Sequence, residues 1–132
     1  MAQHTFTVEE ANALLSTVRP LVERMVEQRR LLGEALERRQ EFGELTAGNG
    51  GGFDARLPAE LDAAVEKTVE GVKECVEELT GLGVQVKDLD TGLVDFPSLR
   101  DGEEVLLCWQ LGESEIGWWH TLDGGFAGRR PI

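Results

Sequence analysis

The hydrophobic pattern of this chain changes its period at Gly83. From Ala11 to Leu82, apolar side chains recur every three or four residues, which is the spacing of one face of an α-helix. After Gly83 they alternate with polar residues, as they do in half-buried β-strands. The change predicts an α+β fold, in which a long antiparallel helical hairpin precedes a small four-stranded antiparallel β-meander and an ordered C-terminal tail.

The helical hairpin is expected to occupy residues 7–82. Thr7 and Glu10 have the spacing of a capping box, which predicts that the first helix begins at Val8. Pro20 interrupts the first helix without shifting the phase of its apolar positions. Because proline has no N–H group to donate, we expect a kink at Pro20 and not the end of the helix.

A glycine-rich segment, residues 43–57, separates the two helices and is expected to be a flexible loop. It contains no lysine, so it does not fit a phosphate-binding P-loop. Pro58 suits the first position of the second helix.

Two apolar stripes facing each other need further cover, from the sheet or from a second copy of the chain, and we expect a homodimer through the helices. The whole chain, 1–132, is expected to be one domain.

The remainder, residues 83–132, is expected to form the sheet and tail. The predicted strands are 84–88, 93–99, 104–111 and 116–122. Asp101-Gly102 suits a two-residue type I′ turn, and Gly112–Glu115 suggests a second tight turn.

These two turns predict which side chains share a face of the sheet. The first places Phe96 opposite Leu107, and the second places Leu107 opposite His120. His120 is then expected on the apolar core face, whereas Cys108 and Trp119 fall on the other face with Asp95. Cys108 and His120 on opposite faces cannot form a nucleophile and base pair, which argues against a cysteine hydrolase. A bulge in either hairpin would exchange these faces.

The charge balance excludes several classes of partner. The chain has 25 acidic and 13 basic residues and a net charge of −12, so we expect no binding to nucleic acid or to anionic lipid. No segment approaches the roughly 18 apolar residues that a membrane span requires. The two cysteines do not form a C-x-x-C pair, which favours a reduced compartment. We therefore expect a soluble, cytoplasmic protein.

Three segments resemble a bacterial family catalogued as domain of unknown function 2203. They read KDLDTGLVDFPSLRDG at 87–102, LCWQLGESEI at 107–116 and WHTLDGGFAGRRPI at 119–132. The opening FTVEEANALLSTVRPLV is also similar, so the resemblance covers nearly the whole chain. It implies a small bacterial protein and brings no activity with it.

His120 is the candidate catalytic residue. A neutral imidazole on an apolar face can serve as a metal ligand or general base. The carboxylates that could join it at a divalent metal ion are Asp123, three residues on, or Glu9 and Glu10 at the start of the first helix. The alternative is a hydrogen-bonded core histidine without a chemical role. No metal-ligand spacing motif decides between the two.

A second candidate site consists of carboxylates around the sheet and of the tail. The carboxylate set comprises Asp88, Asp90, Asp95 and Glu115, and oxygen ligands of this kind suit magnesium or manganese. Asp95 and Glu115, with Trp119 as a platform, are its candidate ligand-binding residues. Arg129 and the glycine-rich tail offer donors for an anion. The alternative assigns the carboxylates to turns and ion pairs and gives the tail a structural role. In either case Phe126 and Ile132 are expected to anchor the tail.

The sequence thus favours an interaction or small-ligand-binding protein with its site in the sheet and C-terminal tail. The alternative function is a small metal-dependent enzyme that uses His120 with nearby carboxylates. The two differ in whether a divalent cation is required.

Overall fold

The computed structural model describes residues 4–49 and 56–132. The helices are α1 (Val8–Asn49) and α2 (Arg56–Gly81), and the strands are β1 (Gln85–Asp88), β2 (Leu93–Arg100), β3 (Glu103–Gln110), β4 (Trp118–Thr121) and β5 (Arg130–Pro131). A short 3-10 helix, η1 (Phe126–Gly128), precedes β5. The strands form one antiparallel sheet in the order β1-β2-β3-β4-β5, which confirms the predicted α+β fold with five strands in place of four.

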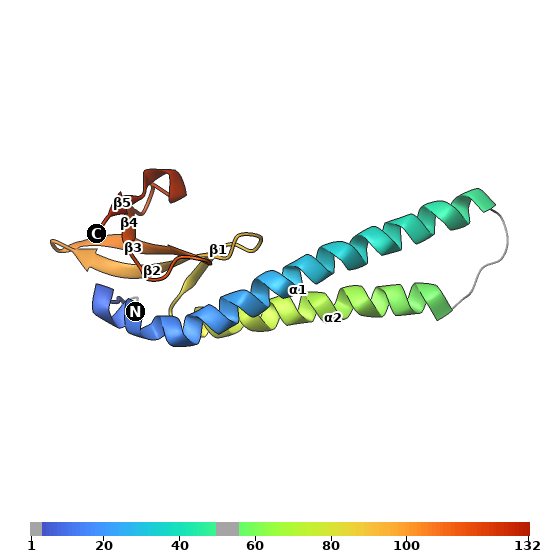
Figure 1. Cartoon of the computed structure of the whole chain (residues 1–132), viewed down its shortest axis with the longest axis horizontal. Coiled ribbons are helices and arrows are strands. Elements are labelled where there is room, and N and C mark those ends of the chain that lie inside the picture. Colours follow the sequence, from blue (N-terminus) through green and yellow to red (C-terminus); the bar gives the residue numbers. More distant parts are fainter. Residues whose placement is uncertain (1–3, 50–55) are drawn as a thin grey trace.

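The two helices run antiparallel as a long hairpin (Figure 1). The predicted capping box is present, because the backbone N–H of Thr7 donates to Glu10 Oε1 at 3.0 Å and that of Glu10 donates to Thr7 Oγ1 at 3.1 Å. Pro20 lies within α1, and the first turns of this helix run in a different direction from the rest (Figure 1). Neither helix, over its described residues, has a stretch apolar enough to cross a membrane.

The loop predicted over residues 43–57 is shorter than expected. α1 continues through Gly43 to Asn49, and α2 begins at Arg56, so both ends of the predicted loop are helical. A glycine inside a helix costs only about 1 kcal/mol relative to alanine, which the helix-favouring residues Glu44 and Leu45 help to offset. The rest of the predicted loop, residues 50–55, lies outside the described residues.

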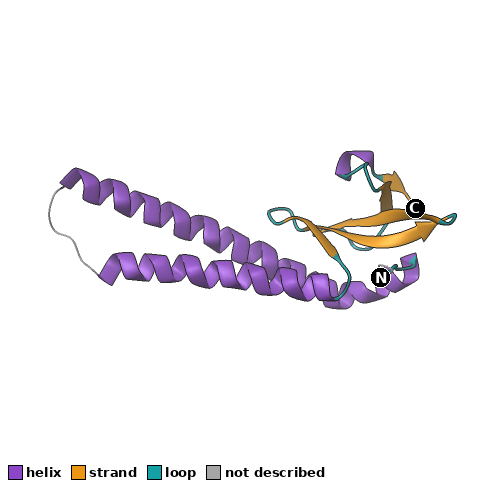
Figure 2. Cartoon of the chain, turned by 180° about the vertical axis from the view of Figure 1, so that it is seen from behind, coloured by secondary structure: helices purple, strands orange, loops and turns teal. Residues whose placement is uncertain are grey.

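The sheet lies across one end of the hairpin, next to the beginning of α1 and the end of α2 (Figures 1 and 2). We call the sheet face toward the hairpin the inner face and the opposite one the outer face. The inner face and the two helices enclose the core. Its buried side chains are Phe6, Ala11, Leu15, Val18, Val22, Met25, Cys75, Leu79, Val84, Val94, Phe96, Leu107, Trp109 and Ile116. The sheet therefore supplies the third surface that the two apolar stripes need at this end.

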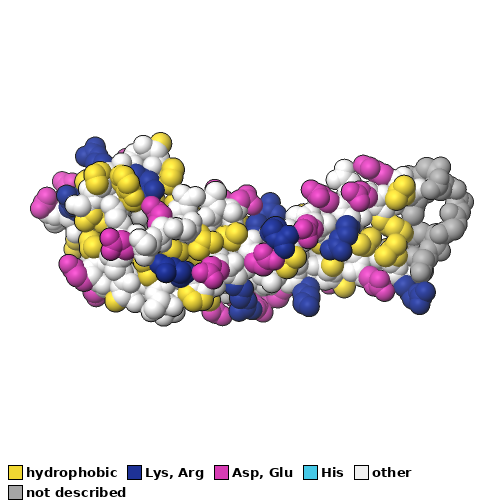
Figure 3. All heavy atoms as spheres, viewed as in Figure 1, with side chains coloured by type: hydrophobic (Ala, Val, Ile, Leu, Met, Phe, Trp, Pro, Cys, Tyr) yellow, Lys and Arg dark blue, Asp and Glu magenta, His cyan; other side chains and the backbone are white. Residues whose placement is uncertain are grey.

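The rest of the hairpin extends beyond the sheet. Figure 3 shows charged side chains of both signs along it, with hydrophobic side chains exposed between them. Leu36 of α1 and Val69 of α2 are each 39% exposed. Ion pairs such as that of Arg39 with Asp62, at 3.5 Å, link the two helices at the surface, where such pairs contribute little stability.

The hairpin of β2 and β3 has the predicted register. Phe96 pairs with Leu107, Val94 pairs with Trp109, and Arg100 pairs with Glu103. Asp101 and Gly102 both have positive φ, of 53° and 81°, as a type I′ turn requires.

The predicted register of β3 and β4 is wrong by one residue. His120 pairs with Leu106, and Trp119 pairs with Leu107. The tight turn expected at Gly112–Glu115 is instead a longer connection fastened to α1, in which Asn12 Oδ1 accepts a hydrogen bond from the backbone of Ile116 at 2.7 Å. Because strand side chains alternate, this one-residue difference exchanges the two faces of β4. His120 therefore lies on the outer face, and Trp119 packs against the core.

The tail is ordered, but not by the anchors that its sequence suggests. Phe126 and Ile132 are 49% and 46% exposed. The tail is held by its backbone: β5 pairs with β4, and the N–H of Ile132 donates to the carbonyl of Gly117 at 2.9 Å.

Gly92, in the turn between β1 and β2, packs closely against α1 and gives a test of the packing. A methyl group at Gly92 would lie 2.8 Å from Val22 Cγ1 and 2.9 Å from Leu111 Cβ, at a φ of 71°. At Gly102, with a φ of 81°, the same methyl group would meet nothing within 4 Å. We expect Gly102→Ala to cost about 1–2 kcal/mol from its backbone conformation alone. Gly92→Ala should cost a further 1–3 kcal/mol or so from overpacking. Urea unfolding of both variants measures the difference, and equal losses would contradict the close packing.

Candidate functional site

Three neighbouring strands bring three reactive side chains together on the outer face. Asp95 of β2, Cys108 of β3 and His120 of β4 each offer one donor atom, and these atoms all lie within 4.8 Å of one another. Their exposed fractions are 1%, 0% and 3%. The predicted separation of Cys108 from His120 is therefore wrong, because it rested on the register of β4. We refer to these three residues as the outer-face triad.

The hydrogen bonds of His120 restrict where its protons lie. Its Nδ1 is 2.7 Å from the backbone carbonyl of Thr121, and its Nε2 is 3.1 Å from Asp95 Oδ2. A carbonyl oxygen only accepts, so Nδ1 must carry a proton. Without a further proton, Nε2 and Asp95 Oδ2 would both be acceptors facing each other. A proton on one of them, or a cation between them, is therefore needed. The pair is thus either protonated or poised to hold a cation.

Cys108 is a thiol and not a ready nucleophile in this environment. Burial raises the pKa of Cys108 to about 12, and the Asp95 carboxylate adds to the rise, whereas the Arg129 guanidinium opposes it. The thiolate is the nucleophilic form, so a high pKa suppresses reactivity near neutral pH. Cysteine hydrolysis is therefore disfavoured by electrostatics, although the triad geometry would allow a nucleophile and base to meet.

Arg129 fastens the tail beside the triad. Its guanidinium donates to both carboxylate oxygens of Glu113, at 2.7 and 2.9 Å, and to the carbonyl of Cys108 at 3.4 Å. The same guanidinium lies over the rings of Trp118 and Phe126, at 5.0 and 4.7 Å. A partly buried ion pair and two ring contacts hold Arg129 in place, so its charge is already balanced within the chain.

A cavity of about 180 Å³ opens above the triad, between the outer face and the segment after β4. Its lining residues are Lys87, Leu93, Asp95, Leu106, His120, Leu122, Asp123, Gly125 and Phe126. Lys87 and Asp123 are exposed and place one charge of each sign at this cavity. The cavity thus joins a buried pair, Asp95 and His120, to solvent-exposed charged groups.

Two buried side-chain atoms in this region, Asp95 Oδ1 and Arg129 Nε, have no hydrogen-bond partner among the described residues, and the first belongs to the triad. Asp95 Oδ1 is inaccessible to solvent and makes no hydrogen bond, although its sister atom Oδ2 contacts His120. Leaving a buried acceptor without a donor costs about 1–3 kcal/mol, and more when it is charged. Such an atom in a well-packed fold calls for a bound donor or cation.

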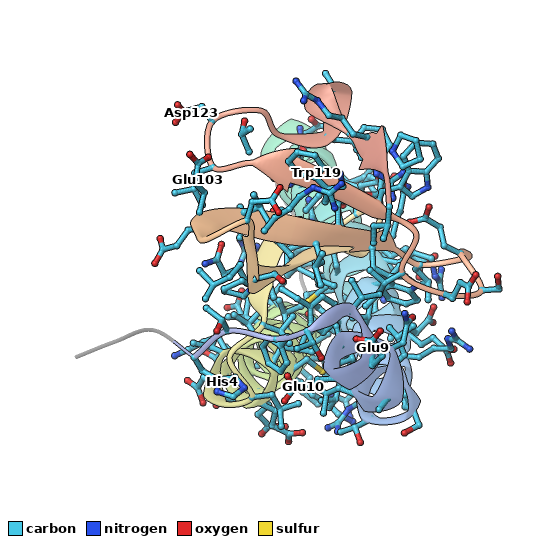
Figure 4. All side chains as sticks on the ribbon, turned by 90° about the vertical axis from the view of Figure 1, so that its left-hand side faces the viewer. His4, Glu9, Glu10, Glu103, Trp119 and Asp123 are labelled. Atoms are coloured by element: carbon cyan, nitrogen blue, oxygen red, sulfur yellow. The ribbon has the colours of Figure 1, made fainter. Side chains whose placement is uncertain are left out.

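Of the remaining predicted site residues, Trp119 and Glu115 do not line this cavity, and Asp123 lines it without joining the triad. Trp119 lies between Arg100 and Arg130, with ring distances of 4.5 and 5.4 Å, beside a surface hollow away from the triad. Glu115 is exposed and borders a hollow against α1. Asp123 lines the triad cavity but does not belong to the cluster of close donor atoms, and Figure 4 shows it at the margin of the molecule, far from α1.

The candidate carboxylate set is likewise dispersed. Asp88 Oδ1 accepts the backbone N–H of Asp90 at 2.8 Å, which is turn chemistry, and Asp90 pairs with Arg29 at 3.3 Å. Of that set only Asp95 reaches the cavity. Sequence reasoning placed Cys108 beside Asp95 but missed that His120 joins them, because the register of β4 was wrong, and it missed Lys87.

Comparison with known protein families identifies the family of this chain. The family described as an uncharacterized conserved protein (DUF2203) matches residues 4–132. The chain belongs to this family. The match confirms the resemblance read from the sequence, and it shows that the triad, the cavity and the hairpin all lie within the DUF2203 region. Comparisons with curated proteins and with solved structures gave no match.

The burial of Cys108 predicts that its thiol resists modification in the folded protein. With a pKa of about 12, the thiolate fraction at pH 8 is about one in ten thousand. In a Cys75→Ser variant, which leaves Cys108 as the one thiol, we expect no reaction with a disulfide reagent until urea unfolds the chain. Burial also raises the pKa of Cys75, so the reciprocal Cys108→Ser variant should behave alike. Rapid modification of folded Cys75→Ser would contradict the buried placement.

Proposed function

We propose that this protein binds a small polar molecule in the cavity between the outer face of the sheet and the C-terminal segment. The observation that carries the proposal is the unpartnered Oδ1 of Asp95, a residue that lines this cavity. At about 180 Å³ the cavity is smaller than the roughly 300–1,000 Å³ of sites for drug-sized ligands. The ligand is therefore a small metabolite.

The lining groups define the chemistry of this ligand. Asp95 Oδ1 calls for a hydrogen-bond donor, and Lys87, for which no ion pair is found among the described residues, offers a cation to an anionic group. A molecule with both features, such as a hydroxycarboxylate or an amino acid, suits a cavity lined by both residues. Free buried cysteines and the net charge of −12 support a soluble protein of a reducing cytoplasm.

A small metal-dependent enzyme is the second candidate function. It is favoured by the Asp95 carboxylate, which lies 3.1 Å from His120 Nε2 and supplies the nearby carboxylate that such an enzyme requires. Asp123, at the same cavity, is then placed to contact a substrate more readily than the ion. This candidate requires a cation at the triad.

Thermal unfolding with added ligands tests the binding proposal. Glycolate and glycine, each with a donor and a carboxylate, should stabilise the chain, and acetate, which lacks the donor, should act more weakly. At a concentration one hundred times Kd, a bound ligand adds about 2.7 kcal/mol. Lys87→Ala should abolish the shift, whereas Lys73→Ala, an exposed lysine of α2, should keep it.

Blocking the cavity gives a second arm of that test. Leu122 is 56% exposed and lines the cavity, whereas Leu99 is 57% exposed and does not. Leu122→Trp should abolish ligand stabilisation and Leu99→Trp should not. No shift with glycolate or glycine in the unsubstituted chain would overturn the proposal.

We further propose that the chain forms a homodimer through the part of the hairpin beyond the sheet. The exposed apolar side chains Leu36 and Val69 support this pairing, because a second hairpin would cover them. Sedimentation should give about twice the chain mass of 14.5 kDa. Leu36→Glu should return the mass to that of one chain, and Leu99→Glu, on the sheet, should not. A single-chain mass for the unsubstituted protein at working concentrations would contradict the dimer.

A further inference from the structure

With Cys108 deprotonated on binding, the outer-face triad would match the charge of a divalent cation. A carboxylate, a thiolate and a neutral imidazole sum to two negative charges, which a doubly charged ion cancels. The triad side chains are almost fully buried, and a buried charge is tolerated only when it is compensated. The neighbouring Arg129 and Glu113 cancel each other, so they leave this balance unchanged.

The hydrogen bond from His120 to Thr121 prepares the ring as a ligand. Nδ1 donates to the Thr121 carbonyl, so in the neutral ring the lone pair is on Nε2, which faces Asp95. Histidine ligands of metals almost always donate their other N–H to a carbonyl or carboxylate in this way. The Nε2 lone pair and the Asp95 carboxylate repel each other unless a proton or a cation lies between them. The geometry of the triad therefore requires one or the other.

The donor atoms are close to the spacing of a coordination shell. In a tetrahedral zinc site, bond lengths of about 2.0–2.3 Å place neighbouring donor atoms roughly 3.3–3.6 Å apart. Nε2 and Asp95 Oδ2 are 3.1 Å apart, and all three donors, Cys108 Sγ included, lie within 4.8 Å. An ion therefore requires side-chain adjustments of about an ångström and no change of the backbone.

We propose that Asp95, Cys108 and His120 bind a divalent cation of the zinc class, with its fourth coordination position toward the cavity. A thiolate with an imidazole selects zinc over magnesium or calcium, which prefer oxygen ligands. Cys108 binds as the thiolate, and its proton leaves to solvent. Three protein ligands with one position open are the pattern of zinc sites that act on a bound molecule. The inference rests on the ligand-binding cavity proposed above, since that cavity gives the ion its open position.

Cobalt binding tests the inference directly. The full chain, freed of metal with a chelator, is titrated with Co²⁺ and separately with Zn²⁺. We expect about one equivalent of each ion to bind, and the Co²⁺ form to show intense visible bands of tetrahedral geometry with a thiolate-to-cobalt charge-transfer band in the near ultraviolet. A chain that takes up neither ion, or binds Co²⁺ without the charge-transfer band, overturns the proposal.

Matched variants assign the ligands. Cys108→Ser should abolish the charge-transfer band, and Cys75→Ser should leave it intact. His120→Gln and Asp95→Asn should weaken Zn²⁺ affinity by about a hundredfold or more, since even the loss of an outer-shell partner costs about 10–100-fold. His4→Gln, at the other histidine of the chain, should bind Zn²⁺ as the unsubstituted chain does. Metal binding that persists in Cys108→Ser places the ion elsewhere and overturns the assignment.

Nitrogen NMR of His120 in the unsubstituted chain keeps the test independent of how the variants fold. Added Zn²⁺ should shift the Nε2 resonance of His120 and leave Nδ1 protonated. Two protonated ring nitrogens that Zn²⁺ does not change would identify a structural imidazolium–carboxylate pair and overturn the inference.

The metal inference and the ligand proposal can each be contradicted without the other. A chain that binds Zn²⁺ but neither glycolate nor glycine contradicts the ligand proposal alone. A chain that binds glycolate without taking up Zn²⁺ contradicts the metal inference alone.

Discussion

The outer-face site depends on how α1 holds the connection between β3 and β4. Asn12 accepts the N–H of Ile116, and Arg19 donates to the carbonyl of Ser114 at 3.0 Å, so this connection lies on the helix and is not a tight turn. β4 consequently begins at Trp118, one residue out of the register that a short turn would give. That single residue turns His120 away from the core and toward Asp95. A pair of contacts to the first turns of α1 thus determines the chemistry on the far side of the sheet.

The same arrangement divides the molecule into an apolar side and a polar side. Trp109, Phe96 and Val94 fill the space between the inner face and the hairpin, and each is fully buried. The outer face receives little cover from the helices, and the tail supplies it instead. Arg129 helps to hold the tail over the outer face. It pairs with Glu113, which belongs to the segment between β3 and β4 that α1 already holds. The segment after β4 lies over this side of the sheet and leaves a cavity beside the triad.

Much of the fold could be predicted from local pattern. The capping box at Thr7 and Glu10 and the type I′ turn at Asp101-Gly102 depend on neighbouring residues, and both were predicted correctly. The register of β2 and β3 followed from that turn. Predictions that relied on a residue's general preference fared less well. Phe126 was expected to be a buried anchor, yet it lies half exposed against Arg129, because backbone pairing holds the tail.

The sequence by itself determined the order of helices and strands, the face of each helix that is buried, and His120 and Asp95 as residues worth attention. These follow from periodicity and residue type, which are local properties. Only the tertiary structure decided that His120 meets Asp95 and Cys108, while Glu115 and Trp119 lie elsewhere. Strand side chains alternate with a period of two, so the partners of a residue depend on a register that long-range contacts to Asn12 and Arg19 set. No local pattern in β4 contains that information, since Trp118 and Trp119 are equally plausible on either face.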